Sequence, residues 1–218
     1  MVIERDNLGQ VLALEVRTRI CSGALPAGQR INEVHLARDL AVSRTPLREA
    51  LTRLAGEAFL EVTPRRGFSV PPLSEDEVRE LYPIRATLDP WALRLAGIPP
   101  RMTQVGLDAV NREMLDSARD VARVIELDDR FHMSLLAGCP NKTLLGLIRQ
   151  MMWRTRRYEH LYFSERRHVA DAVKTHRELL AHLRDGDLRG ACALLEENMK
   201  TASPALVAAI RAANGGPA

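Results

Sequence analysis

The stretch 43–51, Ser-Arg-Thr-Pro-Leu-Arg-Glu-Ala-Leu, is the part of the sequence that most limits the fold. Ser43 is a residue type that caps helix N-termini, and Pro46 falls in the first turn, where its missing N–H costs little. We therefore predict a helix over 44–55. A shorter helix over 33–40 precedes it across a tight turn, and two helices spaced in this way are typical of a helix-turn-helix unit.

The flanking residues predict the rest of a small domain. One helix is expected over 8–20, with an apolar face formed by Val11, Leu12, Leu14, Val16 and Ile20. Residues 59–63 and 67–70 alternate as two strands, and the connection between them is turn-rich and basic. Three helices followed by a hairpin form a winged helix-turn-helix, whose third helix enters the major groove of DNA. We place this domain at 1–70.

Several side chains of this domain are suited to DNA. Arginine at the start of the third helix can form a bidentate pair with guanine, and hydroxyls and a helix N-terminus bind phosphate. Taken singly, these arginines also fit an ordinary solvated helix face, but the turn before them and the basic wing after them favour DNA. The expected contact residues are Arg38, Ser43, Arg44, Thr45, Arg48, Arg65, Arg66 and Gly67.

The second part of the chain has a different pattern. The two prolines of the linker 71–74 disfavour helix, and long amphipathic helices follow over 75–213. Hydrophobic residues make up 46% of the chain and aromatic residues 4%, so strong helix formers dominate and a mostly α fold is predicted. Pro83 and Pro90 should kink or split the first helix. The expected helices are 75–97, 103–116, 119–137, 142–163, 168–184 and 187–212.

Asp128 and His132 form the most informative polar pair of this part. They are four residues apart on a strongly helical stretch, so both side chains project from one face, beside Phe131 and Leu135. A carboxylate and an imidazole placed in this way can chelate a divalent ion if other helices supply further ligands. The same spacing also fits a solvated or simply hydrogen-bonded pair.

Charge and composition limit the possible partners and location of the protein. The formal net charge of +3 is compatible with a nucleic-acid partner but does not require one. No apolar run approaches the length of a membrane span and no leader opens the chain, so a cytoplasmic protein without a membrane partner is expected. The three cysteines, Cys21, Cys139 and Cys192, form neither a disulfide framework nor a metal motif, and we interpret them as small buried hydrophobes.

The motifs of the first domain resemble the GntR family of bacterial regulators. The resemblance rests on Val-Ser-Arg-Thr-Pro-Leu-Arg-Glu-Ala-Leu at 42–51, Leu-Pro-Ala-Gly at 25–28 and Pro-Arg-Arg-Gly-Phe-Ser-Val at 64–70, and covers roughly residues 8–70. It implies a homodimer on a palindromic DNA operator. Arg44 and Arg48 are then the expected base readers, with Ser43, Thr45 and Gly67 at the backbone or wing and Arg38 as a weaker phosphate contact.

From Leu73 onward the chain is similar to the FadR-type (FCD) C-terminal domain, an all-α antiparallel helical bundle. Many such domains carry Asp-x-x-x-His and two later histidines, which implies metal ligands at Asp128, His132 and His176. The last position falls on Asn198, which departs from the pattern. Three alternatives remain open: a three-ligand site with Asn198 as a weak fourth donor, a site for a harder ion such as manganese, or a lost metal site. The expected cofactor is zinc, nickel or manganese.

Arg85, on the first helix of this domain, matches an arginine that often faces the ligand cavity in the group. Arg154 and Arg157 could also point inward, because arginine is the natural fork for a carboxylate. The resemblance implies a small organic acid as effector, bridging the metal ion and an arginine. Arg149 and Arg156 fit a basic surface patch better. We expect a repressor rather than an enzyme, and the alternative is a constitutive DNA-binding protein with an inert dimerisation domain.

Overall fold

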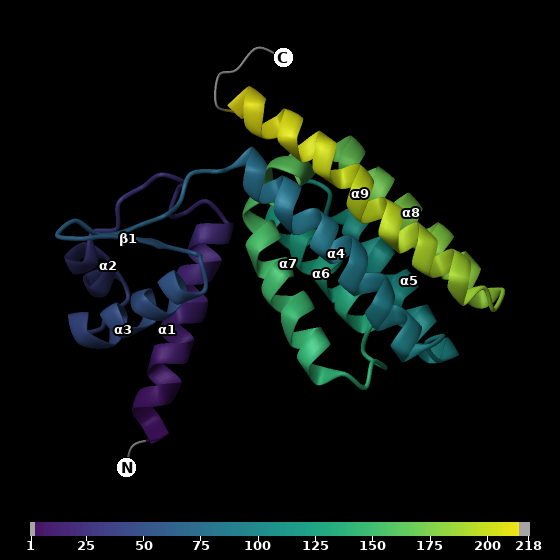
Figure 1. The fold of residues 1–218 in the computed structure, drawn as a ribbon, viewed down its shortest axis with the longest axis horizontal. Coiled ribbons are helices and arrows are strands. Elements are labelled where there is room, and N and C mark those ends of the chain that lie inside the picture. Colours follow the sequence, from purple (N-terminus) through teal and green to yellow (C-terminus); the bar gives the residue numbers. More distant parts are fainter. Residues whose placement is uncertain (1–2, 214–218) are drawn as a thin grey trace. The chain divides into compact units, whose positions relative to one another are not determined.

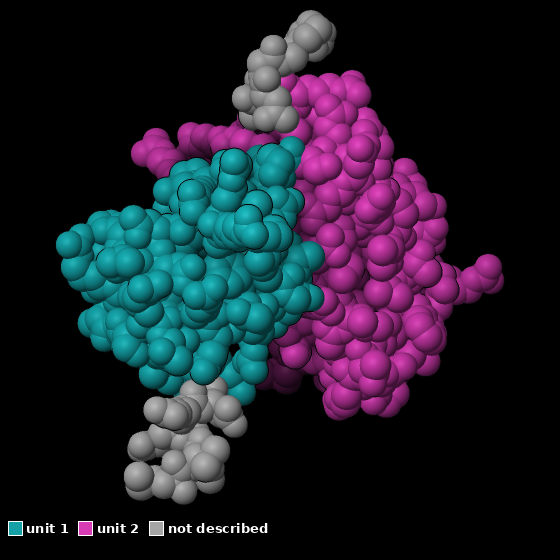
Figure 2. All heavy atoms as spheres, turned by 60° about the vertical axis from the view of Figure 1, so that its left-hand side comes forward, with its two compact units in different colours: residues 1–73 teal, residues 74–218 magenta. Residues whose placement is uncertain are grey.

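The computed structural model describes the backbone of residues 3–213 and the side chains of residues 8–211. It divides into two compact units, 1–73 and 74–218, which Figure 2 shows in different colours. The first two residues of the expected DNA-binding domain lie outside the described range. The prediction of a mostly α fold, with a winged helix-turn-helix before an all-helical domain, is confirmed. Within the described range, no helix combines the length and the apolar character that crossing a bilayer requires.

Unit 1 is the winged helix-turn-helix. Its two strands pair antiparallel, with Val62 opposite Phe68. The segment before α2 joins this ribbon, because the Ile31 N–H donates to the Phe68 carbonyl at 2.9 Å and the Val70 N–H donates to the Gln29 carbonyl at 2.8 Å. The wing is therefore attached along its second strand. The elements of unit 1 are α1 (Ile3–Cys21), α2 (Glu33–Asp39), α3 (Arg44–Gly56), β1 (Glu61–Thr63) and β2 (Gly67–Ser69).

Helix α3 begins and packs as its sequence predicts. Ser43 is the N-cap residue, although its side chain makes no capping hydrogen bond. Asn32 caps α2 more fully, since its Oδ1 accepts from the N–H groups of Val34 and His35 at 3.1 and 3.0 Å. One face of α3 is fully buried and holds the helix against α1 and α2, which leaves the opposite face exposed. The buried residues are Leu47, Ala50, Leu51 and Leu54.

Two expectations for unit 1 are wrong in detail. Val11 and Leu14 are not on the buried face of α1, because they are 56% and 49% exposed. Leu12, Val16 and Ile20 are buried and recur every fourth position, so these three of the five expected residues form one stripe.

The wing strands are also shorter than the expected 59–63 and 67–70. Phe59 is still bound to the end of α3, where its N–H donates to the Leu54 carbonyl at 2.9 Å. Phe59 and Leu60 then pack in the core of unit 1, whereas β1 is exposed along its whole length. The ribbon therefore begins only after these two core residues.

Unit 2 is a helical bundle with one apolar core. Helices α4 and α9 lie side by side over much of their length, and α5 packs on both α6 and α8 (Figure 1). Helix α7 contacts α4, α6, α8 and α9. The helices are α4 (Glu75–Ala96), α5 (Arg101–Asp116), α6 (Val121–Leu135), α7 (Lys142–Phe163), α8 (Arg166–Arg184) and α9 (Leu188–Ala213).

The two prolines do not split α4, which continues through both Pro83 and Pro90. Carbonyl groups near them find side-chain donors: the Thr87 hydroxyl donates to the Pro83 carbonyl at 3.0 Å, and the Cys192 thiol donates to the Pro90 carbonyl at 3.6 Å. Packing along α9 also supports the helix. All three cysteines are buried and unoxidised, as expected.

Candidate DNA interface and candidate metal and effector site

The exposed face of α3 and the wing enclose a hollow of ≈ 700 Å³ in unit 1. Arg44 and Arg48 reach it from α3, while Arg65 and Arg66 reach it from the turn between the strands. All four arginines are exposed. Positive groups on two sides of one hollow are suited to bind a polyanion such as the DNA backbone.

The other predicted contact residues lie around this hollow. Ser43 and Thr45 are exposed at the N-terminus of α3, and Thr45 lines the adjoining depression on that helix. Gly67 has φ +81°, a left-handed conformation that favours glycine, and thereby turns the chain from Arg66 into β2. Arg38 is exposed on α2, where its guanidinium lies 2.8 Å from Nδ1 of His35.

Arg30 and Glu33 also line the hollow, and sequence reasoning did not select them. Arg30 forms a bridge with Ser69 of the wing, which brings a residue of the loop before α2 into the DNA face. No local pattern predicts that bridge, because the two residues are far apart in sequence.

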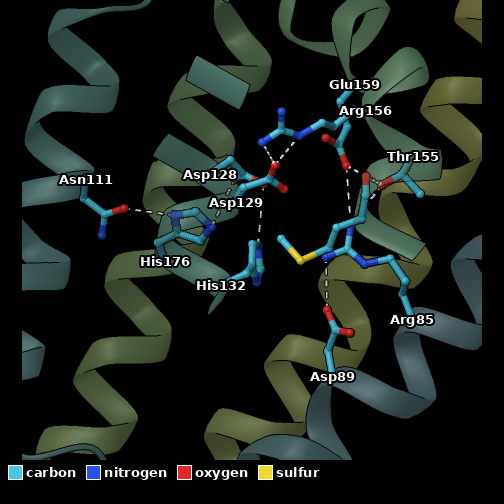
Figure 3. A network of polar contacts seen from close by, with 11 residues as sticks. Arg85, Asp89, Asn111, Asp128, Asp129, His132, Thr155, Arg156, Glu159 and His176 are labelled. Carbon is cyan, nitrogen blue, oxygen red and sulfur yellow. Dashed lines mark hydrogen bonds and ion pairs between the residues drawn. The ribbon is translucent and has the colours of Figure 1, made fainter. Parts of the chain in front are cut away.

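In unit 2, Asp128, His132 and His176 come together in the interior. One potential ligand atom from each lies within 4.8 Å of the others. Nε2 of His176 is 3.5 Å from Asp128 Oδ1, and Nε2 of His132 is 3.8 Å from Asp128 Oδ2. The two histidines are 2% and 1% exposed, so water is largely excluded. The expected pair on α6 thus meets the expected histidine of α8 (Figure 3).

Neighbouring side chains fix the His176 ring. Asn111 of α5 accepts a hydrogen bond through Oδ1 from Nδ1 of His176 at 2.9 Å. The Phe131 ring stacks on the imidazole with centroids 3.7 Å apart. With its proton on Nδ1, His176 presents the lone pair of Nε2 toward Asp128 (Figure 3). This is the arrangement by which outer partners orient metal-binding histidines.

Burial sets the protonation of the cluster. It lowers the pKa of His176 to about 3, and it lowers the pKa of His132 well below the ordinary value, with His176 and Arg85 adding to the effect. Both imidazoles are therefore neutral near pH 7. Burial also raises the pKa of Asp128, and the carboxylates of Glu159 and Asp129 raise it further. A cation would reverse this cost for Asp128.

A cavity of ≈ 270 Å³ opens onto the cluster. Asp128, His132 and Asn198 line it, so the residue that departs from the family pattern faces the same space as two of the expected ligands. Arg85 lines the cavity as well. The donor set fits a divalent ion, because Nε2 of His176, which lies toward Asp128, is buried and has no hydrogen-bond partner.

Arg85 is held in a buried network rather than projecting alone. Its Nη2 donates to Asp89 Oδ2 at 3.0 Å, and its Nη1 lies 3.4 Å from the Thr155 hydroxyl and 3.5 Å from Glu159 Oε1 (Figure 3). Nε of Arg85 has no hydrogen-bond partner. Arg85 is 2% exposed and is one of the residues that line the cavity.

Arg154 and Arg157 lie elsewhere. Arg154 donates to Glu77 Oε1 through Nη2 at 2.7 Å, and Nη2 of Arg157 is 3.8 Å from Glu77 Oε2. The Tyr158 hydroxyl donates to Glu77 as well, and the Ser74 N–H donates to Tyr158 at 3.3 Å. These arginines join α7 to the first turn of α4 and are not among the residues that line the cavity.

Three residues of this site escaped sequence reasoning. Asp89 follows Arg85 at the i,i+4 spacing, which was a usable signal for an ion pair on one helix face. Asn111 and Glu159 carried no such signal, since their partners lie on other helices. Only the packing of α4, α5, α7 and α8 brings these groups together.

A winged helix-turn-helix with arginines around its DNA-facing hollow, joined to a helical unit with a polar cavity, defines a DNA-binding regulatory protein. A family model described as bacterial regulatory proteins of the gntR family matches residues 8–70, and a model of the FCD domain matches residues 80–201. The second match alone covers more than half of the chain. The chain belongs to the GntR family of bacterial transcription regulators and carries an FCD domain.

Individual relatives are also named as bacterial transcription regulators. The Nta operon transcriptional regulator of Aminobacter aminovorans is 35% identical over 177 residues, which cover 72% of this chain and 81% of the relative. The gluconate operon transcriptional repressor of Bacillus subtilis is 27% identical over 155 residues, covering 69% and 61%. The solved structure of Escherichia coli McbR/YncC matches with a TM-score of 0.80 and 25% identity, covering 91% of this chain and 96% of that one.

Proposed function

We propose that this regulator is a repressor that binds a palindromic operator as a homodimer and releases it when a small organic acid enters the cavity of unit 2. A divalent ion held by Asp128, His132 and His176 forms part of the effector site. The observation that carries the proposal is the buried cluster itself: two neutral imidazoles and a carboxylate offer ligand atoms within 4.8 Å of one another, and Asp128 and His132 line a cavity.

The charge and chemistry of the cluster support a metal ion. A carboxylate buried beside neutral histidines is costly unless a cation compensates it. Two nitrogen donors and one oxygen donor suit zinc, nickel or manganese, and the amide oxygen of Asn198 would be a weaker fourth donor from the cavity wall. When bound, the ion supplies a Lewis-acidic partner for an effector carboxylate.

Arg85 supplies the second anchor for the acid. The arginine lines the cavity and its Nε has no hydrogen-bond partner, so an effector carboxylate beside it could accept from this guanidinium. A volume of ≈ 270 Å³ limits the ligand to a small molecule. In this proposal Arg154 and Arg157 act through Glu77, at the start of α4, rather than by touching the ligand.

The DNA-binding unit supports the homodimer part of the proposal, and the name of the gluconate operon repressor supports repression. One α3 reads one half-site, and two copies are needed for a palindrome with half-sites about one helical turn apart. Base reading is assigned to Arg44 and Arg48, phosphate and wing contacts to Arg38, Ser43, Thr45, Arg65, Arg66 and Gly67. The effector can release DNA only by binding more tightly to an arrangement that does not fit the operator.

The experiment measures operator affinity with and without candidate acids. Operator DNA is selected from a random library by the metal-loaded protein and titrated by fluorescence anisotropy in the presence of small mono- and dicarboxylic acids. We expect at least one acid to weaken binding by about tenfold or more, a typical allosteric coupling. His132→Ala should lose this response, whereas His160→Ala, outside the cluster, should keep it. Operator binding that no acid changes would instead favour a constitutive DNA-binding protein.

A further inference from the structure

The network around the cavity contains more carboxylates than guanidinium groups. Asp89 pairs with Arg85 at 3.0 Å, and Asp129 pairs with Arg156. Two further carboxyl groups, those of Asp128 and Glu159, lie within the same network. Figure 3 shows both ion pairs and the two remaining acids. Neither of these two acids therefore has a guanidinium group to itself.

These two carboxylates are not equivalent. Asp128 belongs to the metal-binding cluster, in which one ligand atom per residue lies within 4.8 Å of the others. Glu159 is not a member of that cluster among the described residues. A divalent ion at the cluster would compensate Asp128 but not Glu159, which also lines the cavity. A positive group on a ligand there would stabilise the charged form of Glu159.

The geometry of Glu159 shows where that group would bind. Its Oε1 accepts from the Thr155 hydroxyl at 2.8 Å and lies 3.5 Å from Nη1 of Arg85. Its Oε2 is buried and has no hydrogen-bond partner. The residue is 5% exposed and is one of the residues that line the cavity, so a ligand there would lie beside this carboxylate. An unsatisfied buried carboxylate oxygen is costly, which favours a ligand with a strong donor.

We propose that the effector is an α-amino acid whose ammonium group binds Glu159 and whose carboxylate binds Arg85. This inference rests on the proposed function and names the ligand class of the same cavity. The atoms without a hydrogen-bond partner are Nε of Arg85 and Oε2 of Glu159. On the same two side chains, Nη1 of Arg85 lies 3.5 Å from Oε1 of Glu159. An anion-binding and a cation-binding group side by side match the carboxylate and ammonium that an α-amino acid carries on one carbon.

A simple carboxylic acid fits this cavity less well. It would satisfy Arg85 but leave Oε2 of Glu159 unpaired, and it would add a second negative charge close to the first. A hydroxy acid would donate a hydrogen bond without supplying the positive charge. The apolar part of the lining, Phe163, Ala172, Met199 and Ala202, has room for a small or medium aliphatic side chain.

Matched probes test the proposal on the metal-loaded, full-length protein. Isothermal titration calorimetry would compare alanine, lactate and propionate, and then leucine with its hydroxy and deaminated analogues. Within each set the skeleton is constant and only the ammonium group changes. We expect an amino acid to bind at least about tenfold more tightly than its hydroxy analogue, since a site built to pair a buried group discriminates strongly against a ligand that lacks it.

Two variants connect this preference to Glu159. Glu159→Gln keeps the shape but removes the charge, so it should remove the preference for the amino acid. Asp171→Asn removes one charge from an exposed residue of the same cavity and should keep the preference. Metal content, measured by mass spectrometry, should be unchanged in both variants, which separates an effect on the ligand from an effect on the cluster.

The outcomes distinguish this inference from the proposed function. Lactate or propionate binding as tightly as alanine, with operator release intact, would overturn the amino-acid assignment and leave the proposed function standing. An undiminished preference in Glu159→Gln would also overturn it. If neither these probes nor any other small acid binds the metal-loaded protein, both the inference and the effector role of the cavity fail.

Discussion

The two units carry their functional residues in opposite ways. In unit 1 the predicted DNA contacts are exposed side chains of α3 and the wing, most of them within a short stretch of sequence. In unit 2 the polar residues of the site are buried and come from α4, α5, α6, α7 and α8. A surface that binds a polyanion needs only exposed charge on a rigid frame, whereas a sensor cavity must balance each buried charge. Substitutions of these residues in unit 1 should therefore change DNA binding alone. Substitutions of the polar residues in unit 2 should change both ligand binding and the stability of the fold.

The largest expected effect is that of Arg85→Met on stability. Removing the guanidinium leaves the buried Asp89 carboxylate without its partner, and breaking a buried pair costs about 3–5 kcal/mol. Urea unfolding followed by tryptophan fluorescence measures it, because Trp91 and Trp153 both lie in unit 2. Arg79→Met, which removes an exposed arginine from the same helix, should change the stability by about 1 kcal/mol or less. A loss for Arg85→Met as small as this would contradict the buried network.

The next effect is on the pH dependence of stability. Burial and the Asp129 carboxylate raise the pKa of Glu159 to about 7 from an ordinary value of 4.5. The folded protein thus binds this proton more tightly than the unfolded chain. Proton binding therefore stabilises the fold below about pH 4.5, and this stabilisation is lost as the pH rises to about 7. As the pH rises through this window, the free energy of unfolding of metal-free Glu159→Gln should increase relative to that of the metal-free parent by on the order of 2–3 kcal/mol.

Urea unfolding of both metal-free proteins at several pH values measures this difference. The exposed residue Asp171 provides the control, since Asp171→Asn should run parallel to the parent over the same range. Parallel curves for Glu159→Gln and the parent would mean that Glu159 is not a buried, uncompensated acid.

In unit 1 the expected effect is on DNA binding alone. Arg44→Ala should weaken binding to the selected operator by about 1–3 kcal/mol, because one bidentate base contact is lost. The stability of the protein should change little, since Arg44 is exposed. Anisotropy titrations with operator and with random DNA separate specific from general binding. Arg112→Ala, an exposed arginine of α5, is the control, and an equal loss in both variants would point to net charge rather than base reading.

The smallest expected effect concerns the orientation of His176. Asn111→Ala removes the acceptor that fixes the imidazole, and the loss of such an outer partner lowers metal affinity by about 10- to 100-fold. Competition with a fluorescent chelator measures this. Gln104→Ala removes another buried amide of α5, which donates to the Pro99 carbonyl, and should leave the metal affinity unchanged. Equal metal affinities in the two variants would show that Asn111 does not orient a metal ligand.

This contrast also explains what the sequence could predict. The helices and the wing follow from capping residues, prolines and periodicity, and the arginines of unit 1 follow from their place on those elements. In unit 2, Asp128 and His132 were accessible because one helix holds both, and His176 only through the family pattern. Asn111 and Glu159 could not be predicted, because their partners are brought to them by tertiary packing. The same limit applies to Arg154 and Arg157, whose partner Glu77 lies on another helix.

Metal content is the most direct test of the buried cluster on which the proposed function depends. Untagged protein purified without chelator would be analysed by mass spectrometry, together with His176→Ala and the control His160→Ala. The account predicts close to one divalent ion per chain in the parent and in His160→Ala, and none in His176→Ala. Parent protein that is free of metal and takes up neither zinc, nickel nor manganese would contradict it.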